Sequence, residues 1–260
     1  MKNIFLKVVL ICGILFSCSS ENDILLDNGN NGNTNVSTNR QATGSSANDL
    51  LSADSFKKMI IEIAYIDGFK PSETAKNNFK NFINNRTFKP EGVEFIEKQI
   101  PSTGKTVYTL NEVVAIEKEF RTQYNTSSKI AVWVLFINGK SSKDDNQGSI
   151  LGSAYWNTSF VIYEETIHGL SDSAFEPERS LLESSVINHE FGHILGLTNL
   201  GSNLQSDHED AAHPKHCIEE DCLMYWAAEN SKGITNMISR GQVPTLDAQC
   251  LADLKANGGK

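Results

Sequence analysis

Residues 180–196 read SLLESSVINHEFGHILG. The apolar residues of this stretch recur at helical spacing, and Pro177 and Glu178 stand just before it, where they favour the first turn of a helix. Gly196 closes the stretch, because a glycine can adopt the left-handed conformation that ends a helix and turns the chain back. We therefore expect one long helix over residues 180–195.

Two histidines of this helix, His189 and His193, stand four positions apart, so both lie on one helix face and can reach one metal ion. Glu190 follows the first histidine, where its carboxylate can take a proton from a water molecule that Zn²⁺ has made more acidic. The HEFGH motif thus predicts a zinc site with His189 and His193 as ligands and Glu190 as general base.

The remaining chain predicts the sheet and helices around this helix. The continuous apolar run KIAVWVLFIN, residues 129–138, is typical of a strand buried on both faces. Further strands are expected over 93–100, 150–156 and 159–164, and further helices over 50–66, 71–84, 111–124 and 245–256. This order predicts one layered domain of the α+β (α/β) class over residues 49–260.

Composition narrows the function. The chain of 260 residues has 39% hydrophobic and 21% charged residues, close to the globular average, which argues against a disordered chain, a collagen or a coiled coil. Asp and Glu number 32 against 23 Lys and Arg, a formal net charge of −9. We expect no nucleic-acid partner, because phosphate binding needs a basic face.

The N-terminus predicts export. Residues 1–17, MKNIFLKVVLICGILFS, combine two lysines with an apolar run that is too short to span a bilayer, and this pattern fits a secretory signal peptide. Residues 15–18, LFSC, resemble a bacterial lipobox, so we expect Cys18 to be lipidated. The lipid would anchor the protein to a bacterial membrane. We expect this to be the outer membrane, with the protein on its periplasmic or surface face. An ordinary signal peptide is the alternative. Residues 18–48, rich in Asn, Ser, Gly and Thr, are expected to form a flexible tether.

The HEFGH motif and the segment after it resemble the metzincin zinc metalloproteases. HEFGHILG (189–196), a later His and then Cys-Leu-Met-Tyr (222–225) are similar to that clan's helix, third ligand and Met-containing turn. The segment from His216 to Met224 is similar to that of archaemetzincins. The resemblance implies a metzincin-like zincin domain, with a mixed sheet, an active-site helix and a loop-rich C-terminal subdomain. It also implies that Met224 is the Met-turn residue and that the protein cleaves peptide bonds as a monomer.

Two departures from the clan leave alternatives open. The usual third-ligand position holds Asn199, a poor zinc ligand, so the resemblance nominates His216, with His208 and then His213 as alternatives. Archaemetzincins hold a structural zinc with four cysteines, but after Met224 only one cysteine remains, Cys250.

In an exported protein Cys217 and Cys222 are expected to form a disulfide, with a second zinc on Cys217, Cys222 and Cys250 as the alternative. Residues 152–155 are the candidate edge strand for an extended peptide.

Two other interpretations remain. One is a gluzincin with Glu209, Glu219 or Glu220 as third ligand, against which the placements of Gly196 and Met224 argue. The other is a non-catalytic surface lipoprotein, a binding module whose zinc site is structural or degenerate; a structural site is closed by four protein ligands, whereas a catalytic site keeps one position open.

Overall fold

The computed structural model describes residues 34–146, 148–174, 176–237 and 241–260. The predicted signal peptide, residues 1–17, and the predicted lipidation site at Cys18 lie outside the described residues. Within them, no helix is both long enough and apolar enough to cross a membrane.

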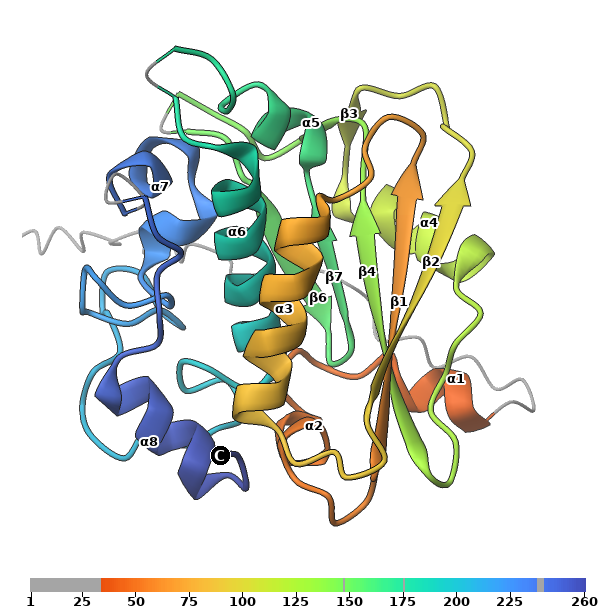
Figure 1. Ribbon diagram of the computed structural model, residues 1–260, viewed down its shortest axis with the longest axis vertical. Helices are drawn as coiled ribbons and strands as arrows, with labels where there is room; N and C mark the ends of the chain where they lie inside the picture. Colours follow the sequence, from red (N-terminus) through yellow and green to blue (C-terminus); the bar gives the residue numbers. More distant parts are fainter. Residues whose placement is uncertain (1–33, 147, 175, 238–240) are drawn as a thin grey trace, which may run out of the picture.

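A five-stranded sheet forms the centre of the domain (Figure 1). Its strand order is β2-β1-β4-β7-β6, and all neighbours are parallel except β6 and β7, which are antiparallel. The strands are β1 (Lys58–Ile66), β2 (Val93–Ile100), β4 (Lys129–Phe136), β6 (Gly152–Trp156) and β7 (Ser159–Ile162). A small parallel pair is formed by β3 (Val107–Tyr108) and β5 (Lys140–Ser141). This mixed sheet confirms the predicted α/β class.

Helices cover both faces of the sheet. Figure 1 shows α3 (Glu73–Arg86) and α6 (Arg179–Ile194) side by side in front of the strands. The helix α4 (Leu110–Phe120) packs on the opposite face. The shorter helices are α1 (Thr34–Thr38), α2 (Ala47–Leu51), α5 (Glu164–His168), the 3₁₀-helix η1 (Trp226–Glu229), α7 (Ser231–Met237) and α8 (Ala248–Ala256). The chain after α6 is mostly loops, as expected.

The strand β4 confirms the prediction of burial on both faces. Val132, Val134 and Phe136 belong to the core under α3 and α6, whereas Trp133 and Leu135 belong to the core under α4. Because successive side chains of a strand point to opposite faces, one continuous apolar run supplies both cores.

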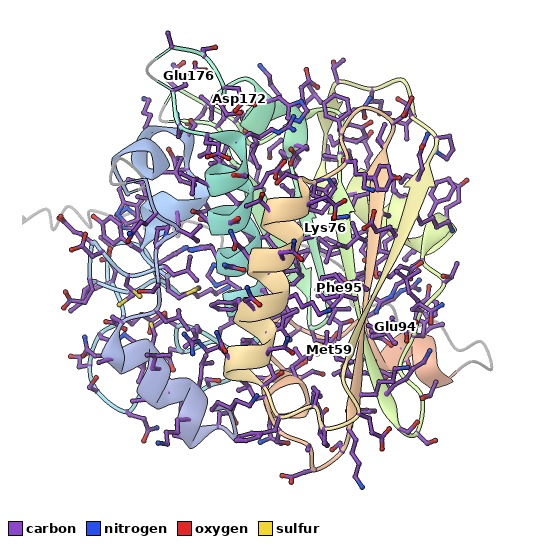
Figure 2. All side chains as sticks on the ribbon, in the orientation of Figure 1. Met59, Lys76, Glu94, Phe95, Asp172 and Glu176 are labelled. Atoms are coloured by element: carbon purple, nitrogen blue, oxygen red, sulfur yellow. The ribbon has the colours of Figure 1, made fainter. Side chains whose placement is uncertain are left out.

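Aromatic rings join α3 to the sheet and to α6. Phe79 on α3 packs edge-on against Phe95 of β2, with ring centroids 5.8 Å apart, and against Phe191 of α6, at 5.0 Å. Figure 2 labels Phe95 among the side chains that fill this region. Such edge-to-face contacts add to the stabilisation that comes from burial. They fix α6, the helix that carries the HEFGH motif, against the rest of the domain.

The predicted helix over residues 50–66 is wrong. Only residues up to Leu51 are helical, and Lys58–Ile66 forms β1, which pairs in parallel with β2 on one side and β4 on the other. Residues 59–66 are apolar except for Glu62, which is buried and accepts hydrogen bonds from Thr122 and Gln123, so their pattern fits helical spacing and a buried strand equally well.

The predicted tether over residues 18–48 is wrong for its described part. Asn39 is fully buried, and its side-chain amide donates hydrogen bonds to Asn125 Oδ1 at 2.9 Å, Ala131 O at 3.0 Å and Thr158 Oγ1 at 3.0 Å. A Cβ added to Gly44 would lie 1.6 Å from Leu200 O, so this glycine is in close contact with the domain. Buried polar contacts hold this segment, and a composition poor in apolar residues gives no sign of them.

Candidate metal centre

The helix α6 places the two histidines of the motif in the interior. His189 is 0% exposed and His193 is 5% exposed, and their rings meet edge to face with centroids 4.7 Å apart. The two Nε2 atoms lie 3.1 Å from each other. The four-residue spacing therefore brings both imidazoles to one point, as predicted.

Backbone carbonyls fix the orientation of both rings. Nδ1 of His189 lies 2.7 Å from the carbonyl oxygen of Leu223, and Nδ1 of His193 lies 3.0 Å from that of Leu197. Because a carbonyl oxygen only accepts, each Nδ1 must donate its proton, which leaves the lone pair of a neutral imidazole on Nε2. Leu223 lies in the turn before Met224, so this turn directly orients His189.

His216 joins them from the loop after α6. Its ring stacks on His189 at 5.4 Å and meets His193 edge to face at 5.1 Å, and its Nδ1 faces the carbonyl oxygen of Pro214 at 3.2 Å. The structure thus brings together the three histidines nominated as ligands. Asn199, at the usual third position of the clan, donates its side-chain amide to Glu209 Oε2 at 2.8 Å instead.

The other loop histidines lie elsewhere. His208 is buried between Asp253, whose Oδ2 lies 2.8 Å from its Nε2, and Cys217. His213 binds Asp210 Oδ2 at 2.7 Å and stacks on Trp226 at 4.4 Å. Neither belongs to the histidine cluster.

A carboxylate that sequence reasoning missed completes this cluster. Glu229 lies at the end of η1, and its Oε2 is 3.8 Å from His189 Nε2, while its Oε1 is 3.4 Å from His216 Nε2. Donor atoms of His189, His193, His216 and Glu229 all lie within 4.8 Å of one another. Nothing in the local sequence marks this residue, since it stands five positions after Met224 in a short loop helix.

Burial keeps the imidazoles in the form that binds metal. Burial lowers the pKa of His189 to about 4 and lowers that of His193 well below its usual value, so both are neutral near pH 7. Burial would raise the pKa of Glu229, but its interaction with His216, and to a smaller extent with the other two histidines, outweighs burial and lowers that pKa to about 2. A charged carboxylate therefore faces neutral nitrogen donors.

These donors fit a zinc ion. Two inward-facing Nε2 lone pairs at 3.1 Å repel each other unless a cation lies between them, and nitrogen and carboxylate oxygen are ordinary zinc ligands. Hydrogen bonds from each Nδ1 to a carbonyl are the usual support of a metal-binding histidine. The geometry can thus hold a divalent metal through three or four protein ligands.

Glu190 lies on the same helix, against the edge strand β6. It is 0% exposed, and a Cβ added to Gly152 would lie 2.7 Å from both its Cγ and its Oε1. Only a glycine at position 152 leaves room for this carboxylate. The strand therefore helps to position the predicted general base.

Met224 packs against the helix α6 at Gly192. It is fully buried, and a Cβ added to Gly192 would lie 2.4 Å from its Sδ. Its carbonyl oxygen accepts a hydrogen bond from the backbone N–H of Cys217 at 2.8 Å. This bond ties the loop that carries His216 to the turn that orients His189.

The predicted disulfide between Cys217 and Cys222 is not formed. Both are free, buried thiols, as is Cys250, and the three sulfurs form a cluster with a carboxylate oxygen of Asp247, all within 4.8 Å of one another. Cys222 Sγ lies 3.7 Å from Cys250 Sγ, and Cys217 Sγ lies 3.6 Å from Asp247 Oδ2. Four donor atoms around one point are typical of a metal site rather than of a disulfide, which needs only two cysteines.

The thiol of Cys222 is the most acidic of this cysteine cluster. Hydrogen bonds from Cys217 and Cys250, with further ones from the backbone N–H groups of Asp247 and Met224, lower its pKa to about 4. A thiolate is the form that binds metal. The sequence showed three of these four donors; Asp247 was missed, although it stands three positions before Cys250, the spacing of a paired ligand.

Comparisons with known proteins support the fold. No protein-family model and no curated protein matches the sequence. The structure is similar to the crystal structure of archaemetzincin from Methanopyrus kandleri, with a TM-score of 0.52 and 15% sequence identity, over 77% of this chain and 96% of that one. The chain therefore has an archaemetzincin-like fold that carries two candidate metal sites, one of histidines with Glu229 and one of cysteines with Asp247.

Proposed function

We propose that the protein is a zinc-dependent endopeptidase. The proposal rests on the convergence of the Nε2 atoms of His189, His193 and His216, each of whose rings faces a backbone carbonyl. Glu190, a buried glutamate, lies on α6 with the first two of these histidines. The archaemetzincin-like fold also supports the proposal.

Glu190 is the proposed general base. When bound, a zinc ion held by three imidazoles lowers the pKa of a water molecule and polarises the carbonyl of a substrate. Glu190 accepts the proton of that water at a carboxylate oxygen and returns it to the amine of the leaving peptide. Its burial against Gly152 keeps the carboxylate in one position and excludes bulk water.

We propose that β6 binds the substrate backbone. It is the last strand of the sheet and pairs with β7 along one edge, and its residue Ser153 is partly exposed. An extended peptide can add to the other edge through backbone hydrogen bonds. Glu190, packed against this same strand, would then face the scissile bond.

The sequence also supports proposals about location and partners. We propose that the protein is exported, anchored to a bacterial membrane through a lipid on Cys18, and monomeric, with peptides or proteins as substrates and no nucleic-acid partner. The apolar run before Cys18 supports the anchor, and the net charge of −9 supports the absence of a nucleic-acid partner.

A second zinc ion is proposed for the cysteine cluster. Cys217 and Cys222 flank the segment that leads to Met224, and Cys250 and Asp247 come from the start of α8. A metal on these four donors would join α8 to the Met-turn. Its role would be structural, since four protein ligands close a zinc site.

A non-catalytic binding module is the second candidate. The observation that favours it is Glu229, because three histidines and one carboxylate also suffice to close a zinc site. The two candidates differ in whether peptide bonds are cleaved.

Cleavage of a mixed peptide library by the purified full-length protein tests the choice, with Glu190→Gln as the control. We expect the wild type to cleave peptides and the variant to be slower by about 10²–10⁴-fold with its zinc retained. If the zinc-loaded wild type cleaves no peptide that the Glu190→Gln variant leaves intact, the result supports the binding module.

A further inference from the structure

We propose that Glu229 is a closing ligand: its carboxylate occupies the fourth position on the metal in the resting protein, and an entering substrate displaces it. The inference rests on the proposed function and adds a means of autoinhibition to it. The metal centre would then have two states: a closed state at rest, with Glu229 on the metal, and an open state during cleavage, with Glu229 displaced.

The carboxylate is placed as a ligand. One of its oxygens faces His189 and the other faces His216, at 3.8 and 3.4 Å from the respective Nε2 atoms. With His193 these donors form one group within 4.8 Å. Three nitrogen donors and one oxygen donor would supply the four protein ligands that close a zinc site.

The backbone of Glu229 is attached to the start of the substrate strand. Its carbonyl oxygen accepts a hydrogen bond at 2.9 Å from the backbone N–H of Leu151, the residue before β6. The next residue, Asn230, forms a bridge with Ile150. Glu229 therefore lies between the histidine cluster and the start of β6, the strand to which we propose that a peptide adds.

Glu229 is also the most displaceable member of the cluster. Its side chain is 28% exposed, whereas that of His216 is 11% exposed and that of His189 is 0% exposed. It comes from a four-residue 3₁₀-helix, while His189 and His193 come from the buried core helix α6. A partly exposed side chain at the end of a short 3₁₀-helix can leave the metal without moving the core helix.

A cavity beside the carboxylate gives it a place to which it can move. The cavity has a volume of about 60 Å³ and is lined by Glu229, Ser153 of β6, Tyr163 and Lys143. A displaced carboxylate would meet hydroxyl groups and one cation there, which stabilise a charged group that has lost its metal. One of these residues, Ser153, lies on the strand that we propose binds the substrate.

Competition with a small metal-binding probe tests the proposal. Acetohydroxamate is titrated calorimetrically into the zinc-loaded full-length protein, its Glu229→Gln and Glu229→Ala variants, and Glu91→Gln, which removes a similar charge from an exposed turn far along the chain. Removal of the closing ligand should raise acetohydroxamate affinity by about tenfold or more, because the probe no longer has to displace it. A chelator competition should show zinc affinity lowered by about tenfold in the same two variants.

The outcomes separate this inference from the proposed function. Equal acetohydroxamate affinity in the wild type, Glu229→Gln and Glu229→Ala, with no binding to His216→Ala, overturns the closing ligand and leaves the metal centre intact. Binding that survives in His216→Ala, or that is absent from every variant, overturns both. Unchanged unfolding curves for Glu229→Gln show that a change in affinity does not come from misfolding.

Discussion

Replacement of Gly152 by alanine should disable the proposed general base without removing its metal. The new Cβ would lie 2.7 Å from Cγ and Oε1 of Glu190 and 2.8 Å from Cγ1 of Val186, distances that real Cβ contacts essentially never show. Gly152 is in an extended strand, so the whole effect is steric. Because both neighbours belong to the buried helix α6, the carboxylate must swing away or the helix must shift.

The expected losses of stability and of cleavage rate both follow from this contact. One extra methyl group in a packed interior costs about 1–3 kcal/mol of unfolding free energy. A displaced general base costs about 10²–10⁴-fold in rate, so kcat/KM should fall into that range while zinc content stays unchanged. Peptide cleavage, metal analysis and urea unfolding of the same preparation measure all three quantities.

Gly169→Ala is the matched control. A Cβ there would meet only the carbonyl oxygens of Glu165 and Thr166, both at 3.5 Å, which is ordinary contact. We expect this variant to keep its rate and its stability. A Gly152→Ala protein that retained zinc and cleaved peptides at the wild-type rate would refute the role given to Glu190.

Three further predictions test other parts of the structure. Asn39→Ala should lower the free energy of unfolding in urea by about 2–3 kcal/mol, because it leaves the buried backbone N–H of Asn125 without its acceptor and removes the three hydrogen bonds that the Asn39 amide donates. A loss below about 0.5 kcal/mol, the usual value at a surface position, would instead support a flexible tether. Acid should destabilise the metal-free protein, because the pKa of His189 is about 4 in the folded state and about 6.5 in the unfolded state. Between these pH values the unfolded chain binds more protons than the folded one. The free energy of unfolding therefore falls as the pH drops through this window, by about 3 kcal/mol from this group. Urea unfolding at several pH values measures this loss, which should shrink in His189→Asn; a stability that rises towards pH 4 would contradict it. Cys250→Ser should lower the bound zinc by about one ion per chain and lower the melting temperature, and an unchanged zinc content would argue against the second metal site.

The sequence predicted most of the fold because its signals were local. The run from Lys129 to Phe136 has no polar interruption and indeed lies between two cores. Residues 58–66 were harder to interpret, because their mostly apolar pattern fits a helix as well as a strand. Parallel pairing with β2 and β4 decides that segment, and pairing is not visible in one stretch of sequence.

The candidate site divides in the same way. The spacing of His189 and His193 fixes their relation on one helix, so it could be predicted from the sequence alone. The place of His216 came from a resemblance across an inserted loop, and the structure brings its ring against both other histidines. Glu229 could not be predicted, because only the folding of the chain after Met224 back onto β6 brings it to the centre.

The polar contacts were the hardest to predict. A cluster of three thiols and Asp247 is found in place of the expected disulfide. The sequence offered Cys250 as a partner of Cys217 and Cys222 only in the alternative with a second zinc, and Asp247 was missed. The buried amide of Asn39 likewise depends on acceptors that lie far along the chain.

Metal binding by His189, His193 and His216 in the full-length protein underlies every functional proposal above. An anomalous difference map, from crystals of the zinc-loaded protein and data collected at the zinc absorption edge, tests it most directly. We predict a strong peak between the three Nε2 atoms, with a second peak in the cysteine cluster. A map with no peak among the histidines, even where the cysteine cluster is filled, would contradict the proposed metal centre.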